Sequence, residues 1–262
     1  MSNAYLLAGG RAELERLRLQ AQVWEPDSDA LFDAIPVQRD WHCVDVGCGA
    51  MGVLRSLSKR AASVVGVDTD RNLLDAAQAF VEEQQLANVT LRQANLFEDD
   101  LGTFDLAHLR FMFAPIGRDA ELRERALALV KPGGVLVVQE PDSATWNMLP
   151  PHPRFEELKR VILEAFRLGG GDFDAGRRTF ALLRDAGLRD VQIRAAVHAL
   201  QDAHPYMRVA LQFAASLRPR ITRFLSESEL DALVADVEQL VSAEGNAALT
   251  FTVTQVWGQV PV

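Results

Sequence analysis

Three glycines lie close together in the segment V-D-V-G-C-G-A-M-G, at residues 44–52. Gly47, Gly49 and Gly52 match the pattern G-x-G-x-x-G, which follows a strand in several kinds of nucleotide and nucleoside site. Glycine is costly inside regular structure because it loses more backbone freedom on folding than any other residue. The cluster therefore indicates a turn whose backbone lies close to a phosphate, an adenosyl group or a packed helix.

Two acidic residues lie near this turn in the sequence. Asp45 precedes Gly47 by two residues, where a carboxylate would repel a pyrophosphate and attract a cationic ligand, although it could equally cap its own loop. Asp68 ends the next apolar segment, V-V-G-V-D, and is followed by Thr69. An acid in this place accepts hydrogen bonds from ribose hydroxyls, which NAD sites share, so Asp68 predicts only a ribose.

A third polar position follows in the segment Q-A-N-L-F-E-D-D. Asn95 offers both a donor and an acceptor beside the expected position of an adenine, and Leu96 and Phe97 can pack on its ring. Together these residues describe a site for an adenosine that carries a positive group and no phosphate. S-adenosylmethionine (SAM) is such a molecule. Cys48 inside the turn and Arg110 after a later strand are added to the predicted cofactor contacts, although a packed thiol and a surface ion pair explain them equally well.

Strands that alternate with helices must position these residues. The apolar runs predict strands at 42–47, 63–68, 89–95, 103–109, 135–140, 189–197 and 248–259. The helical patterns cover 12–24, 28–35, 52–60, 71–85, 119–130, 154–168, 177–186 and most of 205–243. This order predicts an α/β fold with a mainly parallel sheet that is buried on both faces.

Five segments resemble, in order and spacing, the motifs of class I SAM-dependent methyltransferases: V-D-V-G-C-G-A-M-G, V-V-G-V-D, Q-A-N-L-F-E-D, F-D-L-A-H-L-R-F and L-V-K-P-G-G-V-L-V-V-Q-E-P-D. The remainder is similar to the branch that contains ubiquinone- and menaquinone-biosynthesis enzymes and natural-product methyltransferases. The resemblance implies a Rossmann-like, seven-stranded, mostly parallel sheet whose last strand is antiparallel. It also implies a division into an N-terminal helical lid (1–36), a SAM-binding core (37–200), a helical insertion over the substrate (201–246) and the final core strand (247–262). Tyr5, Leu6, Arg16 and Gln20 are candidate contacts between this lid and SAM, although amphipathic packing alone accounts for most of the helix.

The chemistry of methyl transfer is harder to assign. The segment F-A-P-I-G lacks a histidine that relatives often carry at this place. A base is needed only if the nucleophile must lose a proton. His152, His204, Tyr206 and Glu140 are weak candidates for that role, and each is more often a packed or solvated residue. Phe111, Phe113 and Trp146 are predicted to line the substrate pocket.

The composition limits the partners. A net charge of −9 argues against nucleic acid as a substrate. No segment is long and apolar enough for a membrane span, and the two cysteines do not have the spacing of a metal site. We therefore expect a cytoplasmic SAM-dependent methyltransferase, with no metal, that acts on O, N or C of a small, partly apolar metabolite and yields S-adenosylhomocysteine. A non-methylating cyclase or scaffold of the same fold and an NAD-dependent oxidoreductase are the alternatives, and a homodimer is an open option.

Overall fold

The computed structural model describes the backbone of residues 11–262 and the side chains from residue 14 onward. Its main sheet has seven strands in the order β3-β2-β1-β4-β5-β10-β7. The strands are β1 (His42–Val46), β2 (Ser63–Asp68), β3 (Val89–Gln93), β4 (Phe104–Arg110), β5 (Val130–Asp142), β7 (Arg189–Ala196) and β10 (Thr252–Gln259). β10 pairs antiparallel with both β5 and β7, and the pairs among the first five strands are parallel. The predicted fold class, with an antiparallel last strand, is confirmed.

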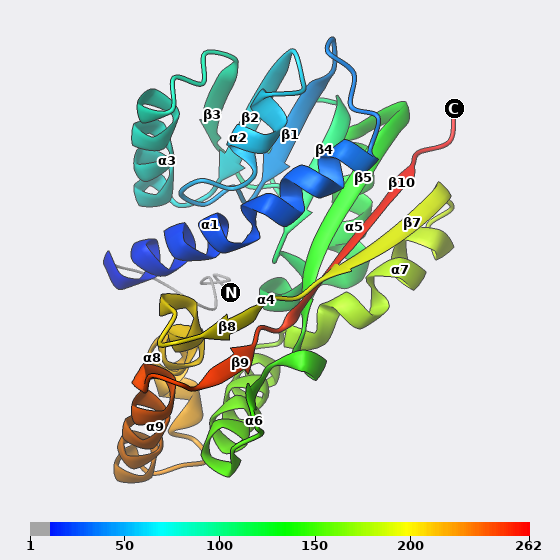
Figure 1. The fold of residues 1–262 in the computed structure, drawn as a ribbon. Coiled ribbons are helices and arrows are strands. Elements are labelled where there is room, and N and C mark those ends of the chain that lie inside the picture. The colour runs from blue at the N-terminus through cyan, green and yellow to red at the C-terminus, as the bar shows by residue number, and fades with distance from the viewer. Residues whose placement is uncertain (1–10) are drawn as a thin grey trace.

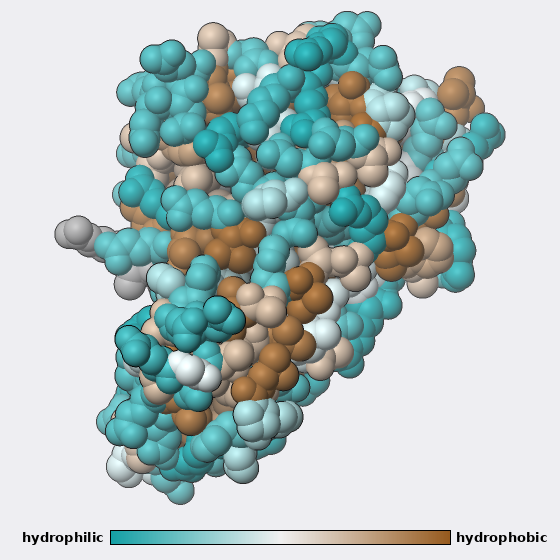
Figure 2. All heavy atoms as spheres, in the orientation of Figure 1, coloured by the Kyte–Doolittle hydropathy of each residue, from teal (hydrophilic) through white to brown (hydrophobic). Residues whose placement is uncertain are grey.

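The helices cover both faces of this sheet and form a separate group beyond its end (Figure 1). They are α1 (Arg11–Ala34), α2 (Leu54–Ser58), α3 (Arg71–Glu83), α4 (Phe113–Ile116), α5 (Asp119–Ala128), α6 (Pro153–Leu168), α7 (Gly176–Asp185), α8 (Val209–Ile221) and α9 (Glu227–Ser242), with short 3₁₀ turns η1 (Ser143–Thr145), η2 (Phe173–Ala175) and η3 (Pro205–Arg208). One apolar core joins the sheet to α1, α2 and α3, and a second joins it to α5 and α7. The sheet is therefore buried on both faces, as the unbroken apolar runs predict. The outer surface seen in the same orientation is mainly hydrophilic (Figure 2).

A third core lies in the helical group, which we call the cap: α6, α8, α9 and a small sheet in the order β6-β9-β8. The small strands are β6 (Asn147–Leu149), β8 (Ala199–Gln201) and β9 (Ala247–Leu249). The single strand predicted over 248–259 is therefore wrong, because the chain leaves β9 in the small sheet before it enters β10 in the main sheet. The division into four domains stays a prediction. In the structure α6, which falls within the predicted core, packs against α8 and α9 of the predicted insertion.

The N-terminal part of the described chain also differs from the sequence prediction. Two helices were expected at 12–24 and 28–35, whereas α1 is one helix of 24 residues that contains Pro26. Proline removes one helical hydrogen bond, but tertiary packing outweighs this cost here. Trp24 before the proline is buried in the core of the cap, and Leu31 and Phe32 after it are buried in the core that joins α1 to the main sheet, so packing against two cores holds the two halves of α1.

Candidate functional site

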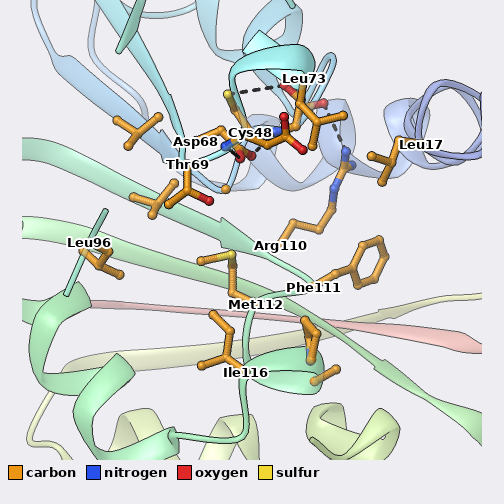
Figure 3. A pocket seen from close by; sticks show the side chains of 18 of the residues that line it. Leu17, Cys48, Asp68, Thr69, Leu73, Leu96, Arg110, Phe111, Met112 and Ile116 are labelled. Atoms are coloured by element: carbon orange, nitrogen blue, oxygen red, sulfur yellow. Dashed lines mark hydrogen bonds between the residues drawn. The ribbon is translucent and has the colours of Figure 1, made fainter. Parts of the chain in front are cut away.

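A cavity of about 830 Å³ opens at the carboxyl ends of β1, β2 and β4 and is lined on one side by α1 (Figure 3). Its volume lies within the range of roughly 300–1,000 Å³ that is usual for small-molecule sites. The cavity brings together the predicted cofactor contacts and one of the predicted substrate contacts: Asp45, Gly47, Cys48, Gly49, Asp68, Thr69, Asn95, Leu96, Arg110 and Phe111. Residues from four separate strand ends thus meet at one edge of the sheet, where open α/β folds bind ligands.

The turn after β1 has the backbone angles and the close contacts that its glycines predict. Gly47, Gly49 and Gly52 have φ angles of +69°, +56° and +50°, which side chains strongly disfavour. A β-carbon on Gly47 would lie 2.3 Å from the sulfur of Met112, and one on Gly52 would lie 2.0 Å from Oδ2 of Asp45. A side chain at Gly47 would have to displace the flexible end of Met112, whereas one at Gly52 would collide with the anchored Asp45 carboxylate and with the backbone oxygen of Cys48 at 3.0 Å.

Asp68 connects the end of β2 to this turn. Its Oδ2 accepts a hydrogen bond of 2.9 Å from the Gly49 amide, and its Oδ1 accepts one of 2.9 Å from the Asp70 amide. Burial raises the pKa of Asp68, and these backbone donors oppose that rise. The carboxylate is thus held at the cavity wall by the backbone on both sides.

The loop after β3 forms the neighbouring wall. Asn95 accepts a hydrogen bond of 3.0 Å from the Phe97 amide through its Oδ1, which fixes the turn. The ring of Phe97 lies 4.1 Å below the guanidinium carbon of Arg118, and both residues line the cavity. We call Gly47, Gly49, Asp68, Asn95 and their immediate neighbours the glycine-turn end of the cavity.

Asp45 is an anchor of the turn. Its Oδ2 accepts a hydrogen bond of 2.9 Å from the Val53 amide, and its Oδ1 lies 2.7 Å from Nδ1 of the buried His108. Of the two roles left open by the sequence, the hydrogen bonds therefore show the loop cap. The same carboxylate also contributes to the cavity wall.

A chain of amides fixes the proton on this histidine. The side-chain nitrogen of Gln255 donates to the backbone oxygen of Asp27 (3.3 Å) and to Oε1 of Gln139 (2.9 Å), so Gln139 presents its nitrogen to Nε2 of His108 at 2.8 Å. Nε2 must then accept, and Nδ1–H donates to Asp45. Burial lowers the pKa of His108, which favours the same neutral form. Sequence reasoning missed His108, whose signal is a polar residue in the middle of the apolar strand F-D-L-A-H-L-R.

Arg110 crosses the cavity from the end of β4 toward the glycine turn, between Asp68 and Thr69 on one side and Leu17 and Phe111 on the other (Figure 3). Its guanidinium donates to the backbone oxygen of Gly52 at 3.1 Å and to Oγ of Ser28 on α1 at 3.3 Å. Burial lowers the pKa of Arg110, and the nearby Asp45 opposes this. A guanidinium remains charged in such a place because its intrinsic pKa is very high.

Beyond Arg110 the cavity is lined by aromatic rings. We call this part the aromatic end, and its rings belong to Phe111, Phe166, Phe173, Phe213 and Phe251. Phe111 has a φ of +57°, a strained value for an aromatic residue and one that often marks a functional position. Sequence patterns predict only Phe111 of this set, because the other four lie far from it in the chain, in α6, η2, α8 and the loop before β10.

Two polar residues of α1 border the aromatic end. Arg16 is 2% exposed, donates a hydrogen bond of 2.9 Å to Gln20, and lies 5.1 Å from the centre of the Phe213 ring. Both residues line the cavity, as the predicted lid contacts require. Tyr5 and Leu6, the other two lid residues of that prediction, lie outside the described residues.

Glu140 does not face the cavity. Its carboxylate is fully buried and accepts hydrogen bonds from three consecutive backbone amides, those of Met112 and Phe113 at Oε1 and that of Ala114 at Oε2. Burial raises the pKa of Glu140 to about 7, against the opposing effect of these donors. The observed role of Glu140 is to hold the start of α4 beneath the cavity.

The other catalytic and substrate candidates also lie away from the cavity wall. His152 and His204 accept hydrogen bonds from backbone amides at the starts of α6 and η3, and Tyr206 accepts one of 2.9 Å from the indole of Trp24. Phe113 and Trp146 are buried in the cores, the latter stacked on Phe173 at 5.3 Å. The two predictions of pocket lining by Phe113 and Trp146 are therefore wrong, because core packing takes up both rings.

The described residues hold no cluster that could bind a metal ion, and none of their helices is long and apolar enough to cross a membrane. Cys43 and Cys48 are both buried thiols without a disulfide.

Comparisons with known proteins agree with this geometry. Residues 44–136 match the family model described as a methyltransferase domain. A ubiquinone biosynthesis O-methyltransferase of Acinetobacter baylyi is 28% identical over 132 residues, which are 44% of this chain and 56% of the relative. A trans-aconitate 2-methyltransferase of Rhizobium rhizogenes is 30% identical over 132 residues, 50% of this chain and 49% of the relative. The chain thus spans about half the length of these curated relatives.

A solved structure extends the likeness to most of the chain. Phosphoethanolamine N-methyltransferase 2 of Haemonchus contortus, in complex with phosphomonomethylethanolamine and S-adenosylhomocysteine, aligns with a TM-score of 0.56 at 17% identity and covers 90% of this chain and 53% of its own. At this identity the likeness concerns the fold. Residues 44–136 are thus similar to a methyltransferase domain, and the chain has the fold of this solved methyltransferase, in agreement with the resemblance of the sequence motifs to class I methyltransferases.

Proposed function

We propose that the protein is a SAM-dependent methyltransferase that acts on a small, partly apolar organic molecule. The observation that carries this proposal is the single cavity that joins the glycine-turn end to the aromatic end, with Arg110 between them. One end has the polar groups that an adenosyl group needs, and the other has the apolar rings that an organic acceptor needs. The methyltransferase domain of residues 44–136 supports the same activity.

The residues at the glycine-turn end fit SAM. Asp68 is positioned to accept hydrogen bonds from the ribose hydroxyls, and Asn95 and Leu96 would contact the adenine. Arg110, held beside the Gly52 oxygen, would pair with the carboxylate of the methionine portion. The bare backbone at Gly49, where a β-carbon would find no atom nearer than 3.9 Å, leaves room for the chain that joins these groups.

SAM supplies an activated methyl group on a positively charged sulfur. The protein then has to hold an acceptor in line with that methyl group and exclude water, which can account for much of the acceleration of such a displacement. The aromatic end is suited to this because its rings remove water from the acceptor. We also propose that α1 acts as the lid, since Leu17 lies against Gly49 while Arg16 reaches Phe213 in the cap.

Calorimetric titration with S-adenosylhomocysteine tests the proposal. We expect Asp68→Ala to weaken binding by roughly 10- to 100-fold, because a hydrogen bond to a charged group contributes about 1.5–3 kcal/mol. Asp75→Ala is the matched control, since Asp75 is an exposed carboxylate on α3 that pairs with Arg71. Absence of measurable heat with the wild-type protein at high micromolar ligand would contradict the proposal.

A labelled-methyl assay separates transfer from the non-methylating alternative. Incubation with methyl-labelled SAM and a panel of small organic acids, phenols and amines is expected to label at least one of them. Binding of S-adenosylhomocysteine without transfer to any compound would favour a scaffold or cyclase. The NAD alternative predicts a change in NADH fluorescence on mixing, and we expect none. The cytoplasmic location and the homodimer remain predictions.

A further inference from the structure

We propose that Ser28 on α1 is a positioning residue, which aims Arg110 at the carboxylate of the cofactor and so makes the cavity selective for nucleosides that carry an amino-acid portion. This inference rests on the proposed function, in which Arg110 pairs with that carboxylate. Ser28 is fully buried and does not line the cavity, so its effect on the cofactor has to pass through another side chain.

Arg110 is held at two points of its guanidinium. One terminal nitrogen, Nη1, donates to Oγ of Ser28 at 3.3 Å, and the other, Nη2, donates to the backbone oxygen of Gly52 at 3.1 Å. Two fixed nitrogens define the plane of the group as well as its position. A guanidinium has five N–H donors, and in the described part of the chain these two acceptors leave the others for a ligand in the cavity that Arg110 lines.

The hydroxyl of Ser28 is oriented as an acceptor. It donates its hydrogen to the backbone oxygen of Trp24, four residues earlier on α1, at 3.0 Å. A hydroxyl has one hydrogen and two lone pairs, so its oxygen accepts from its other neighbours. These are Arg110 and the side-chain nitrogen of Gln139, which lies 3.5 Å away. Since Gln139 is held in turn by Gln255 at 2.9 Å, the oxygen of Ser28 is fixed within a buried network.

Both acceptors of Arg110 are neutral, which leaves the charge of the guanidinium for the cofactor. Carboxylates lie on either side of Ser28 in the sequence, but Asp27 and Asp29 pair with other basic side chains, at 2.7 Å and 2.8 Å. A carboxylate in place of Ser28 would bind the guanidinium more strongly and would compete with the anion of the ligand. A hydroxyl and a carbonyl oxygen direct the guanidinium without competing for its charge.

The two acceptors come from different parts of the fold, the glycine turn and α1. Without the oxygen of Ser28, Arg110 would be held by Gly52 alone, and we expect its guanidinium to adopt several orientations. Its hydrogen bonds to a carboxylate would then form less often. The ribose and adenine contacts proposed for Asp68 and Asn95 do not depend on Arg110, so the loss should be confined to the carboxylate.

Two ligands that differ in one group test this selectivity. S-adenosylhomocysteine and its decarboxylated analogue, in which a hydrogen atom replaces the carboxylate, are titrated by calorimetry. We expect the wild type to bind S-adenosylhomocysteine at least about tenfold more tightly than the analogue. Ser28→Ala should weaken S-adenosylhomocysteine about three- to tenfold and change the analogue less than about twofold. Ser28→Cys gives the same test with a side chain of similar size, because a thiol is only a weak acceptor.

A double-mutant cycle tests whether Ser28 acts through Arg110. In an Arg110→Gln background, Ser28→Ala should change the affinity for S-adenosylhomocysteine by less than about twofold, because the side chain that it positions is gone. Ser56→Ala is the matched control. Ser56 is also a buried serine and lies beside Asp29 of α1, so its removal alters the same part of the helix and should leave the ratio of the two affinities unchanged.

Equal losses of affinity for the two ligands in Ser28→Ala would indicate a merely structural role and would overturn the inference. A loss of undiminished size in the Arg110→Gln background, an unchanged affinity of Ser28→Ala for S-adenosylhomocysteine, or equal binding of both ligands by the wild type would overturn it as well. Failure of the wild-type protein to bind S-adenosylhomocysteine at all would instead contradict the proposed function.

Discussion

The neutral state of His108 can be tested by replacing it with asparagine. His108→Asn keeps a donor close to the position of Nδ1, and so can still donate to Asp45, but it removes the acceptor that Gln139 uses. A buried amide left without its acceptor costs about 1–3 kcal/mol. We therefore expect the free energy of unfolding of the variant to be lower than that of the wild type by about this amount at pH 7.5.

The pH dependence of that difference gives the sharper prediction. Because the folded-state pKa of His108 is lowered from its ordinary value of 6.5, the unfolded chain takes up a proton that the folded protein resists. This contribution to stability is present above pH 6.5 and is lost as the pH falls below it. Between pH 7.5 and 5.5 the loss approaches about 1.4 kcal/mol, the value for one proton over one pH unit below 6.5.

Urea unfolding of both proteins at the two pH values measures this effect. The other histidines are present in both proteins, so their titration cancels in the comparison. We expect the stability gap between the wild type and His108→Asn to become smaller at pH 5.5, by up to about 1.4 kcal/mol. If His108 instead formed a charged pair with Asp45, the gap would grow on acidification. A constant or growing gap would refute the neutral assignment and the amide chain on which it depends.

Three further predictions concern single positions. Gly52→Ala should lower the free energy of unfolding by more than the roughly 1–2 kcal/mol that a side chain at positive φ costs, because its β-carbon would also lie 2.0 Å from Oδ2 of Asp45. Gly102→Ala, at φ +77° with open space around it, should lower the free energy of unfolding by only about 1–2 kcal/mol in the same urea assay. Asp68→Asn should weaken S-adenosylhomocysteine by calorimetry less than Asp68→Ala, because an amide oxygen still accepts. Glu140→Gln should lower the melting temperature, because one of its two terminal atoms becomes a donor facing a backbone N–H; an unchanged value would argue against the observed cap.

The sequence predicted the glycine-turn end better than the aromatic end, for a physical reason. Asp68 and Asn95 follow strands directly, and the carboxyl ends of parallel strands meet at one edge whatever the loops do. Phe213 and Phe251 reach the cavity only because α8 and the loop before β10 are placed by long-range packing in the core of the cap, which no local pattern encodes. Trp146 shows the opposite case: its place in a loop near the site predicts a pocket residue, but its ring is buried and stacked on Phe173.

The continuity of α1 explains how the two ends of the cavity are kept in one arrangement. Arg16 contacts Phe213 of the cap, and Trp24 donates to Tyr206 near the start of α8. About one turn beyond Trp24 on the same helix, Ser28 accepts a hydrogen bond from Arg110 at the glycine-turn side. Two separate helices joined at Pro26, as local sequence patterns suggest, would let these contacts move independently. Because α1 is a single helix, the position of Ser28 beside Arg110 and the position of Arg16 beside Phe213 are fixed together.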